Sequence, residues 1–171
     1  MYYGKRQLIL TCIAAILAGM ILHSVYSWLP NAATALVSPV KESLWEHMKL
    51  IFWPYLAAAL LLNRGRPGGV RPWLLVLPIL CALMLALGYG YHIVLGGESV
   101  AVDLAIYVGL MILGFFLPTC FSGPFHGIKW MVPVAVTIVL AVLIGVFTLW
   151  PPDHILFADL SGAKTWVQIP C

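Results

Sequence analysis

The residues best suited to chemistry lie in the stretch 38–49, which brings two acids, a histidine and two lysines into an otherwise apolar chain. Glu42, Glu46 and Lys49 follow one another at intervals of four and three residues. On a helix they would share one face with Trp53, and His47 adds an imidazole beside them. A mixed acid–base face of this kind suits the binding of a small polar solute or cation, or a proton relay.

The depth of these residues supports a functional interpretation. If Arg64 marks one membrane interface, the ~20 residues before it fill the hydrocarbon, and Glu46, His47 and Lys49 lie in its outer part. A charged group there costs a few kcal/mol, so the face is expected to point into the bundle or a water-filled cavity. The alternative is that Glu46 and Lys49 form an i,i+3 pair that only stabilises the helix.

Three further polar residues, His23, His92 and Asp103, are candidates for the same pocket. His23 lies two turns inside the end of the first apolar run. His92 ends one apolar run and Asp103 begins the next, so the short loop 93–102 would let the two side chains approach. The predicted ligand-binding set is therefore Glu42, Glu46, Lys49, His23, His47, His92 and Asp103.

An enzyme is the rival interpretation of these residues. A membrane-embedded hydrolase or transferase at the outer leaflet could hold a divalent metal through carboxylates and histidines, with one position open for water. His23, Glu46 and His92 would then have to converge. No HExxH or GxSxG motif is complete, so no catalytic residue, metal ligand or cofactor is assigned from the sequence. A third interpretation is a structural or assembly protein whose charges are internal pairs.

The composition indicates that lipid is the solvent of this chain. Of its 171 residues 63% are hydrophobic and 9% are charged, whereas soluble domains carry roughly 25% charged residues. The length suits one bundle without a separate soluble domain. The net charge of +3 is spread thinly, which argues against nucleic acid as a partner. The four cysteines form no CxxC pair, which argues against a disulfide framework.

Apolar runs of spanning length predict an all-α fold, an integral membrane bundle of about five transmembrane helices in a single domain. Ser38 before Pro39 is a good helix start, because serine caps free amides and proline is tolerated at the first helical position. The first run is too long for a signal-peptide core and is expected to be retained. The predicted helices are 8–29, 39–63, 73–95, 101–121 and 129–150, followed by an outer polar tail, 151–171.

The charges of the loops predict the topology. With the N-terminus inside, the inner segments carry six basic residues and the outer segments three, which favours an inside N-terminus and an outside C-terminus. All six acidic residues then map to the outer half. Small residues four apart, such as Ala14 and Ala18, permit close helix contact and an oligomer.

Two stretches also resemble a known family. Residues 22–28 read Leu-His-Ser-Val-Tyr-Ser-Trp and residues 38–54 read Ser-Pro-Val-Lys-Glu-Ser-Leu-Trp-Glu-His-Met-Lys-Leu-Ile-Phe-Trp-Pro. They are similar to the patterns LHxxY and SPVNESxWEHxKLxFxP of small bacterial multi-pass membrane proteins known only as a domain of unknown function. The two prolines and the Leu-Phe-x-Asp step of the family tail match 151–159, whereas Lys41 replaces the usual Asn and the chain diverges after Asp159. The resemblance implies a bacterial plasma-membrane location and supplies no activity.

Together these features favour a multi-pass plasma-membrane protein that binds or transports a small polar solute or ion through an outward-facing pocket. The metal-dependent enzyme and the structural protein remain as alternatives.

Overall fold

The structure, a computed structural model, describes residues 3–66 and 68–162. These residues form helices joined by short connections, without a β-strand among them, which confirms the all-α prediction. Six α-helices occur in this part of the chain: α1 (Lys5–Trp28), α2 (Ala32–Val37), α3 (Leu44–Leu62), α4 (Arg71–Gly88), α5 (Val100–Phe116) and α6 (Val132–Leu149). Shorter helical turns are η1 (Tyr89–Val94), η2 (Leu117–Cys120), η3 (Ile128–Trp130), η4 (Ile155–Phe157) and η5 (Leu160–Gly162).

Four helical segments are long and apolar enough to cross a membrane. They are Lys5–Trp28, Arg71–Val94, Val100–Cys120 and Ile128–Leu149. At 1.5 Å per residue their 21–24 residues extend about 32–36 Å, against a hydrocarbon core of about 30 Å. The chain is therefore a membrane protein, and the kind of membrane stays a prediction.

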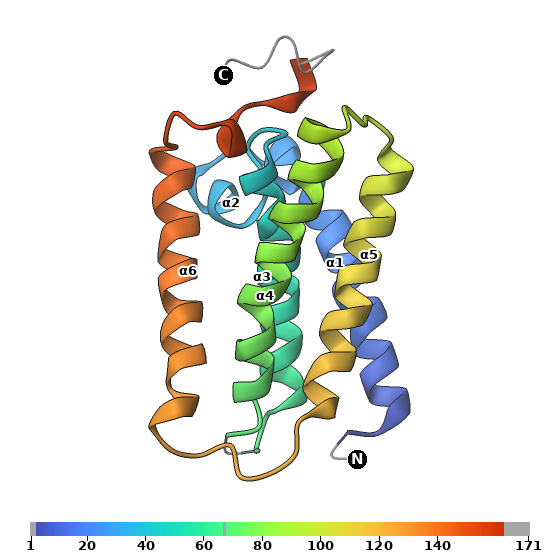
Figure 1. The fold of residues 1–171 in the computed structure, drawn as a ribbon, viewed down its shortest axis with the longest axis vertical. Coiled ribbons are helices and arrows are strands. Elements are labelled where there is room, and N and C mark those ends of the chain that lie inside the picture. Colours follow the sequence, from blue (N-terminus) through green and yellow to red (C-terminus); the bar gives the residue numbers. More distant parts are fainter. Residues whose placement is uncertain (1–2, 67, 163–171) are drawn as a thin grey trace.

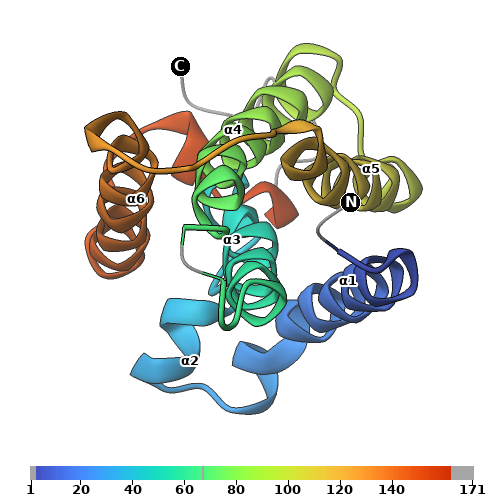
Figure 2. The same ribbon diagram turned by 90° about the horizontal axis from the view of Figure 1, so that it is seen from below.

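The centre of the bundle is formed by α3 and α4. Helix α1 packs on α3, while α5 and α6 both pack on α4, as the view along the bundle in Figure 2 shows. Short helix α2 contacts α1, α3 and α6 and lies near one end of the bundle (Figure 1). The central position of α3 explains why 13 of its 19 residues are buried.

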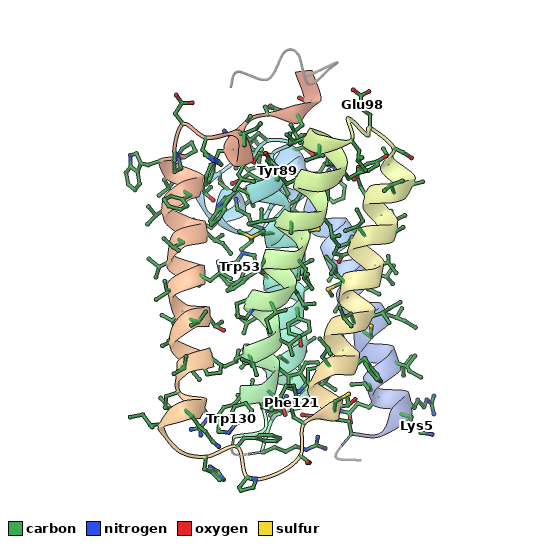
Figure 3. All side chains as sticks on the ribbon, in the orientation of Figure 1. Lys5, Trp53, Tyr89, Glu98, Phe121 and Trp130 are labelled. Carbon is green, nitrogen blue, oxygen red and sulfur yellow. The ribbon has the colours of Figure 1, made fainter. Side chains whose placement is uncertain are left out.

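The two ends of the bundle differ in charge. Figure 3 shows Lys5 and Glu98 at opposite ends. The end where α1 begins, called the basic end here, carries Lys5, Arg6, Arg64, Arg66, Arg71 and Lys129. The other, acidic end carries Glu42, Glu98, Asp103, Asp153 and Asp159, with Glu46 in the first turn of α3. Which end faces which side of the membrane stays a prediction.

The predicted start of the second helix at Pro39 is wrong. The short helix α2 ends at Val37, and a loop of residues 38–43 separates it from α3. Helix α3 begins at Leu44, where the hydroxyl of Ser43 accepts a hydrogen bond from the Glu46 amide. Ser38 is occupied elsewhere: its hydroxyl donates to the carbonyl of Leu22 (2.6 Å) and accepts from the amide of Tyr26 (2.9 Å). This serine therefore ties the 38–43 loop to the last turns of α1 instead of capping a helix.

The α1–α3 contact is close enough to require a glycine. A Cβ atom on Gly19 would lie 2.7 Å from the carbonyl oxygen of Leu50 and would also meet the hydroxyl of Tyr107. We expect Gly19→Ala to destabilise the fold by about 1–3 kcal/mol, because the helices must separate to admit the methyl group.

The matched control for this substitution is Gly109→Ala, since Gly109 also lies within a helix but has open space around it. It should change stability little, or raise it by up to about 1 kcal/mol. Thermal unfolding of both variants in detergent compares the two effects. Equal effects would contradict the close α1–α3 contact.

Candidate functional site

Glu42 is positioned at the acidic end by the loop that joins α2 to α3. The contacts of Ser38 fix the start of this loop against α1, and the Ser43 amide bonds to the carbonyl of Lys41 (2.9 Å) at its end. The loop therefore carries the Glu42 carboxylate to the gap between the last turns of α1 and the first turn of α3.

Two imidazoles meet this carboxylate. Glu42 Oε2 lies 3.2 Å from His47 Nε2, on α3, and 3.6 Å from His23 Nε2, on α1. The two rings are 5.5 Å apart, centroid to centroid. One ligand-type atom from each of the three residues lies within 4.8 Å of the others. Three separate segments thus converge on one point, which we call the His–Glu–His cluster (His23, Glu42 and His47).

The His47 ring is oriented by the backbone. Its Nδ1 lies 2.8 Å from the carbonyl oxygen of Ser43, an acceptor to which Nδ1–H can donate. When the ring is protonated, Nε2–H donates to Glu42 Oε2 on its other side (3.2 Å), and a bound metal ion would take the place of that proton. A backbone carbonyl behind the non-ligating nitrogen is the usual support of a metal-binding histidine.

The spacing of the cluster suits a tetrahedral metal ion. Ligand distances of about 2.0–2.1 Å place two tetrahedral ligands about 3.3–3.4 Å apart. The carboxylate–imidazole separations of 3.2 and 3.6 Å bracket that value. The two imidazole nitrogens lie within 4.8 Å of each other, so they would move closer together around an ion and leave a fourth position open.

Hydrogen bonds keep Glu42 ionised. The His23 and His47 imidazoles hold the pKa of the Glu42 carboxyl well below its usual range, against the opposing effect of partial burial. The side chain is 46% exposed, so solvent moderates this effect. At neutral pH the cluster carries a carboxylate anion, which a cation ligand set requires.

A second histidine–acid pair lies across a small cavity from the cluster. His92 Nε2 is 2.9 Å from Asp103 Oδ1, and His92 Nδ1 is 2.8 Å from the carbonyl oxygen of Gly97. The cavity, of about 100 Å³, is lined by Glu42, His47, His92 and Asp103 together with apolar residues. His92 belongs to the π-helical turn η1, which ends α4; such turns are frequent at functional sites.

The segment after α6 closes this end of the bundle. Phe157 is buried against the rings of Trp45 and Phe147. The amide of Leu160 bonds to the carbonyl of Glu42 (2.8 Å), and its side chain lines the cavity. The predicted outer polar tail thus contains apolar residues that pack on the site, and its residues 163–171 lie outside the described part of the chain.

Glu46 and Lys49 lie apart from the cavity, in a buried pair with its own partners. Lys49 Nζ donates to Glu46 Oε2 (2.6 Å) and to the carbonyl oxygens of Ala35 (2.7 Å) and Ser38 (3.3 Å). All three ammonium hydrogens therefore have acceptors. The exposed fractions of the Lys49 and Glu46 side chains are 0% and 4%.

The pair also holds α2 and its loop. Glu46 Oε2 accepts a hydrogen bond from the Val40 amide (2.8 Å). Ala35 belongs to the last turn of α2, where helical carbonyls lack partners within the helix, and the neighbouring Leu36 carbonyl accepts from Trp53 Nε1 (3.0 Å). Side chains of α3 thus donate hydrogen bonds to the carbonyls at the end of α2, of whose residues Ala35 is the buried one.

The model of a family of unknown function, DUF6512, matches residues 2–165. The chain belongs to this family. The expected membership of an uncharacterised family is confirmed, while the bacterial origin stays a prediction. No curated protein and no solved structure matches the chain.

The structure divides the seven predicted site residues into two groups. Four of them, Glu42, His47, His92 and Asp103, line the small cavity, and His23 contacts Glu42. Glu46 and Lys49 form the separate buried pair. The three residues considered for an enzyme, His23, Glu46 and His92, do not form one group, because Glu46 bonds to Lys49; the ligand-type atoms that converge are those of His23, Glu42 and His47. Leu160 was missed, and its apolar side chain in a short tail gives no signal in the sequence.

Proposed function

We propose that this membrane protein binds a divalent transition-metal ion through His23, Glu42 and His47 at the acidic end of its bundle. The observation that carries the proposal is the convergence of their ligand atoms within 4.8 Å from α1, the 38–43 loop and α3. The sequence predicted a protein that binds a small polar solute or an ion, and metal binding is the second of these possibilities. Glu46 and Lys49 act as structural support.

Zinc is the ion that this ligand set suits best. Two imidazoles and one carboxylate form a mixed nitrogen and oxygen set of the kind used by three-ligand zinc sites, which keep a fourth position for water or substrate. Imidazole ligands disfavour calcium and magnesium, which prefer oxygen. The cavity beside the cluster would receive the fourth ligand.

Retention of the ion at this end is favoured over passage through the bundle. The inner wall of the cavity includes Leu44, Met84, Gly88 and Ile106. Below it, the buried core of α3 and α5 contains Ile51 and Met111, both fully buried. Apolar side chains of this kind give an ion no replacement for its hydration shell.

Metal-dependent hydrolysis is a second candidate function, and the His92–Asp103 pair favours it. A histidine oriented by a carboxylate on the same cavity could serve as general base toward water on the metal. Zinc-dependent hydrolysis of an ester that disappears in His92→Gln, with zinc affinity retained, is the result that would favour an enzyme over a binding protein.

The proposal is tested by zinc titration of the metal-free protein in detergent. Wild type should bind one Zn²⁺ per chain, and His47→Gln should weaken binding by at least about tenfold, because even supporting residues of metal sites contribute 10–100-fold. The matched control is His154→Gln, which removes an exposed imidazole at the same end and should bind like wild type. Binding that is absent from wild type, or is equal in all three proteins, would exclude the cluster as a metal site.

A further inference from the structure

A larger cavity lies at the basic end, away from the metal site. Its volume is about 640 Å³, within the range of small-molecule sites. Three segments enclose it: the start of α1 with Tyr3 and Lys5, the α3–α4 turn with Arg66, and the loop after η2 with Phe121 and His126. Figure 3 shows Lys5 and Phe121 at this end.

The charge of this cavity favours an anion. Lys5, Arg66 and His126 line it, and none of the six acidic residues of the chain does. Ser122 adds a hydroxyl group to the wall, whereas the Thr119 hydroxyl already donates to the carbonyl of Phe116 (2.6 Å). Basic side chains with hydroxyl donors are the groups that bind phosphate oxygens, and a guanidinium can bind two of them at once.

The walls of the cavity are held in place by specific contacts. The Arg66 guanidinium lies 4.8 Å from the centroid of the Tyr3 ring. Tyr3 itself donates to Asn63 Oδ1 (2.6 Å) and accepts from Trp73 Nε1 (2.9 Å). Arg71 Nη1 donates to the carbonyl of Phe125 (2.6 Å), which fixes the loop after η2. Hydrogen bonds thus fix both Tyr3 and the loop after η2, which form the walls beside the basic side chains.

Apolar residues beside the basic ones indicate the kind of anion. Leu8, Pro72, Pro118, Phe121 and Phe125 also line the cavity. The cavity lies where α1 and α4 begin, at the end of the membrane-crossing segments, which is the depth of lipid headgroups. A ligand with a phosphate group and an adjoining hydrocarbon chain matches both halves of this lining.

We propose that this cavity binds the phosphate-bearing headgroup of an anionic phospholipid. The proposal is independent of the metal site, because the two use different residues at opposite ends of the bundle. It also agrees with the predicted topology, in which the basic end faces the inner leaflet and its anionic lipids.

The test measures the melting temperature of the purified full-length protein in neutral detergent with added short-chain lipids. Phosphatidylglycerol should raise the melting temperature, and phosphatidylcholine at equal concentration should not. Arg66→Gln should weaken the phosphatidylglycerol effect by about tenfold or more in apparent affinity, because it removes a charge-assisted hydrogen bond to the phosphate. Arg64→Gln is the control, because Arg64 is exposed in the same turn but does not line the cavity.

Soluble ligands separate the lipid from free phosphate. Glycerol phosphate and inorganic phosphate should shift the melting temperature much less than phosphatidylglycerol does. An equal shift from inorganic phosphate, lost in Arg66→Gln, would overturn the lipid in favour of a soluble phosphate. Equal lipid effects in wild type, Arg66→Gln and Arg64→Gln would overturn the site itself. Without lipid, Arg66→Gln should melt only slightly below wild type, because it loses the contact of the guanidinium with the Tyr3 ring, and a cooperative transition shows that its fold is intact.

Discussion

Lys49→Met should destabilise the protein by about 3–5 kcal/mol, the largest stability effect expected of any side chain in the bundle. Lys49 is fully buried, and its ammonium group supplies hydrogen bonds to Glu46, Ala35 and Ser38. Methionine fills similar space but leaves the Glu46 carboxylate without its cation. It also leaves the carbonyl oxygens of Ala35 and Ser38 without this donor.

The control for this prediction removes both charges together. The double variant Glu46→Gln with Lys49→Met should recover a large part of the lost stability, because the main cost of the single substitution is an unpaired buried charge. Thermal or denaturant unfolding in detergent measures both variants. A single variant as stable as wild type would contradict the structural role of the pair. A double variant no more stable than the single one would show that the carbonyl contacts of Lys49, and not its charge, decide stability.

Glu42→Gln should lower zinc affinity by about 100-fold or more, the largest binding effect expected. The carboxylate is the one anionic ligand of the His–Glu–His cluster, and loss of a residue that only supports a metal ligand already costs about 10–100-fold in affinity. Glutamine keeps the shape of the side chain and a carbonyl oxygen that can accept from His47. The fold should therefore change less than the affinity does.

Glu98→Gln is the matched control, because Glu98 is an exposed acid at the same end (Figure 3). It lies outside the cluster and outside the small cavity. Competition against a zinc chelator gives the affinity of both variants. If they lose affinity equally, the general negative charge of the acidic end binds the metal and the cluster is not the site.

The general fold follows from the sequence because lipid imposes one requirement on every span. Backbone groups in hydrocarbon must bond within the segment, so apolar runs of about 20 residues become helices. The start of α3 could not be predicted in this way. Ser38 has the side chain of a helix cap, but its hydroxyl bonds to Leu22 and Tyr26 of α1. Such a tertiary contact competes with capping and leaves no trace in local sequence.

Part of the candidate site could also be predicted from the sequence. The approach of His92 to Asp103 followed from the short loop between their helices, and the structure has the two side chains 2.9 Å apart. Helical spacing grouped Glu42 with Glu46 and Lys49 instead of with His23 and His47. Glu42 lies in the loop before the first turn of α3, and the path of this loop depends on its contacts with α1. Helical spacing therefore does not predict where its side chain lies.

Zinc K-edge X-ray absorption of the metal-loaded protein tests the central proposal most directly, because it reports the ligands themselves. The predicted spectrum has nitrogen and oxygen ligands at about 2.0–2.1 Å, with the outer-shell scattering of two imidazoles. One imidazole should disappear in His47→Gln and both should remain in His154→Gln. Sulfur at about 2.3 Å, or an imidazole signal unaffected by His47→Gln, would contradict metal binding by His23, Glu42 and His47.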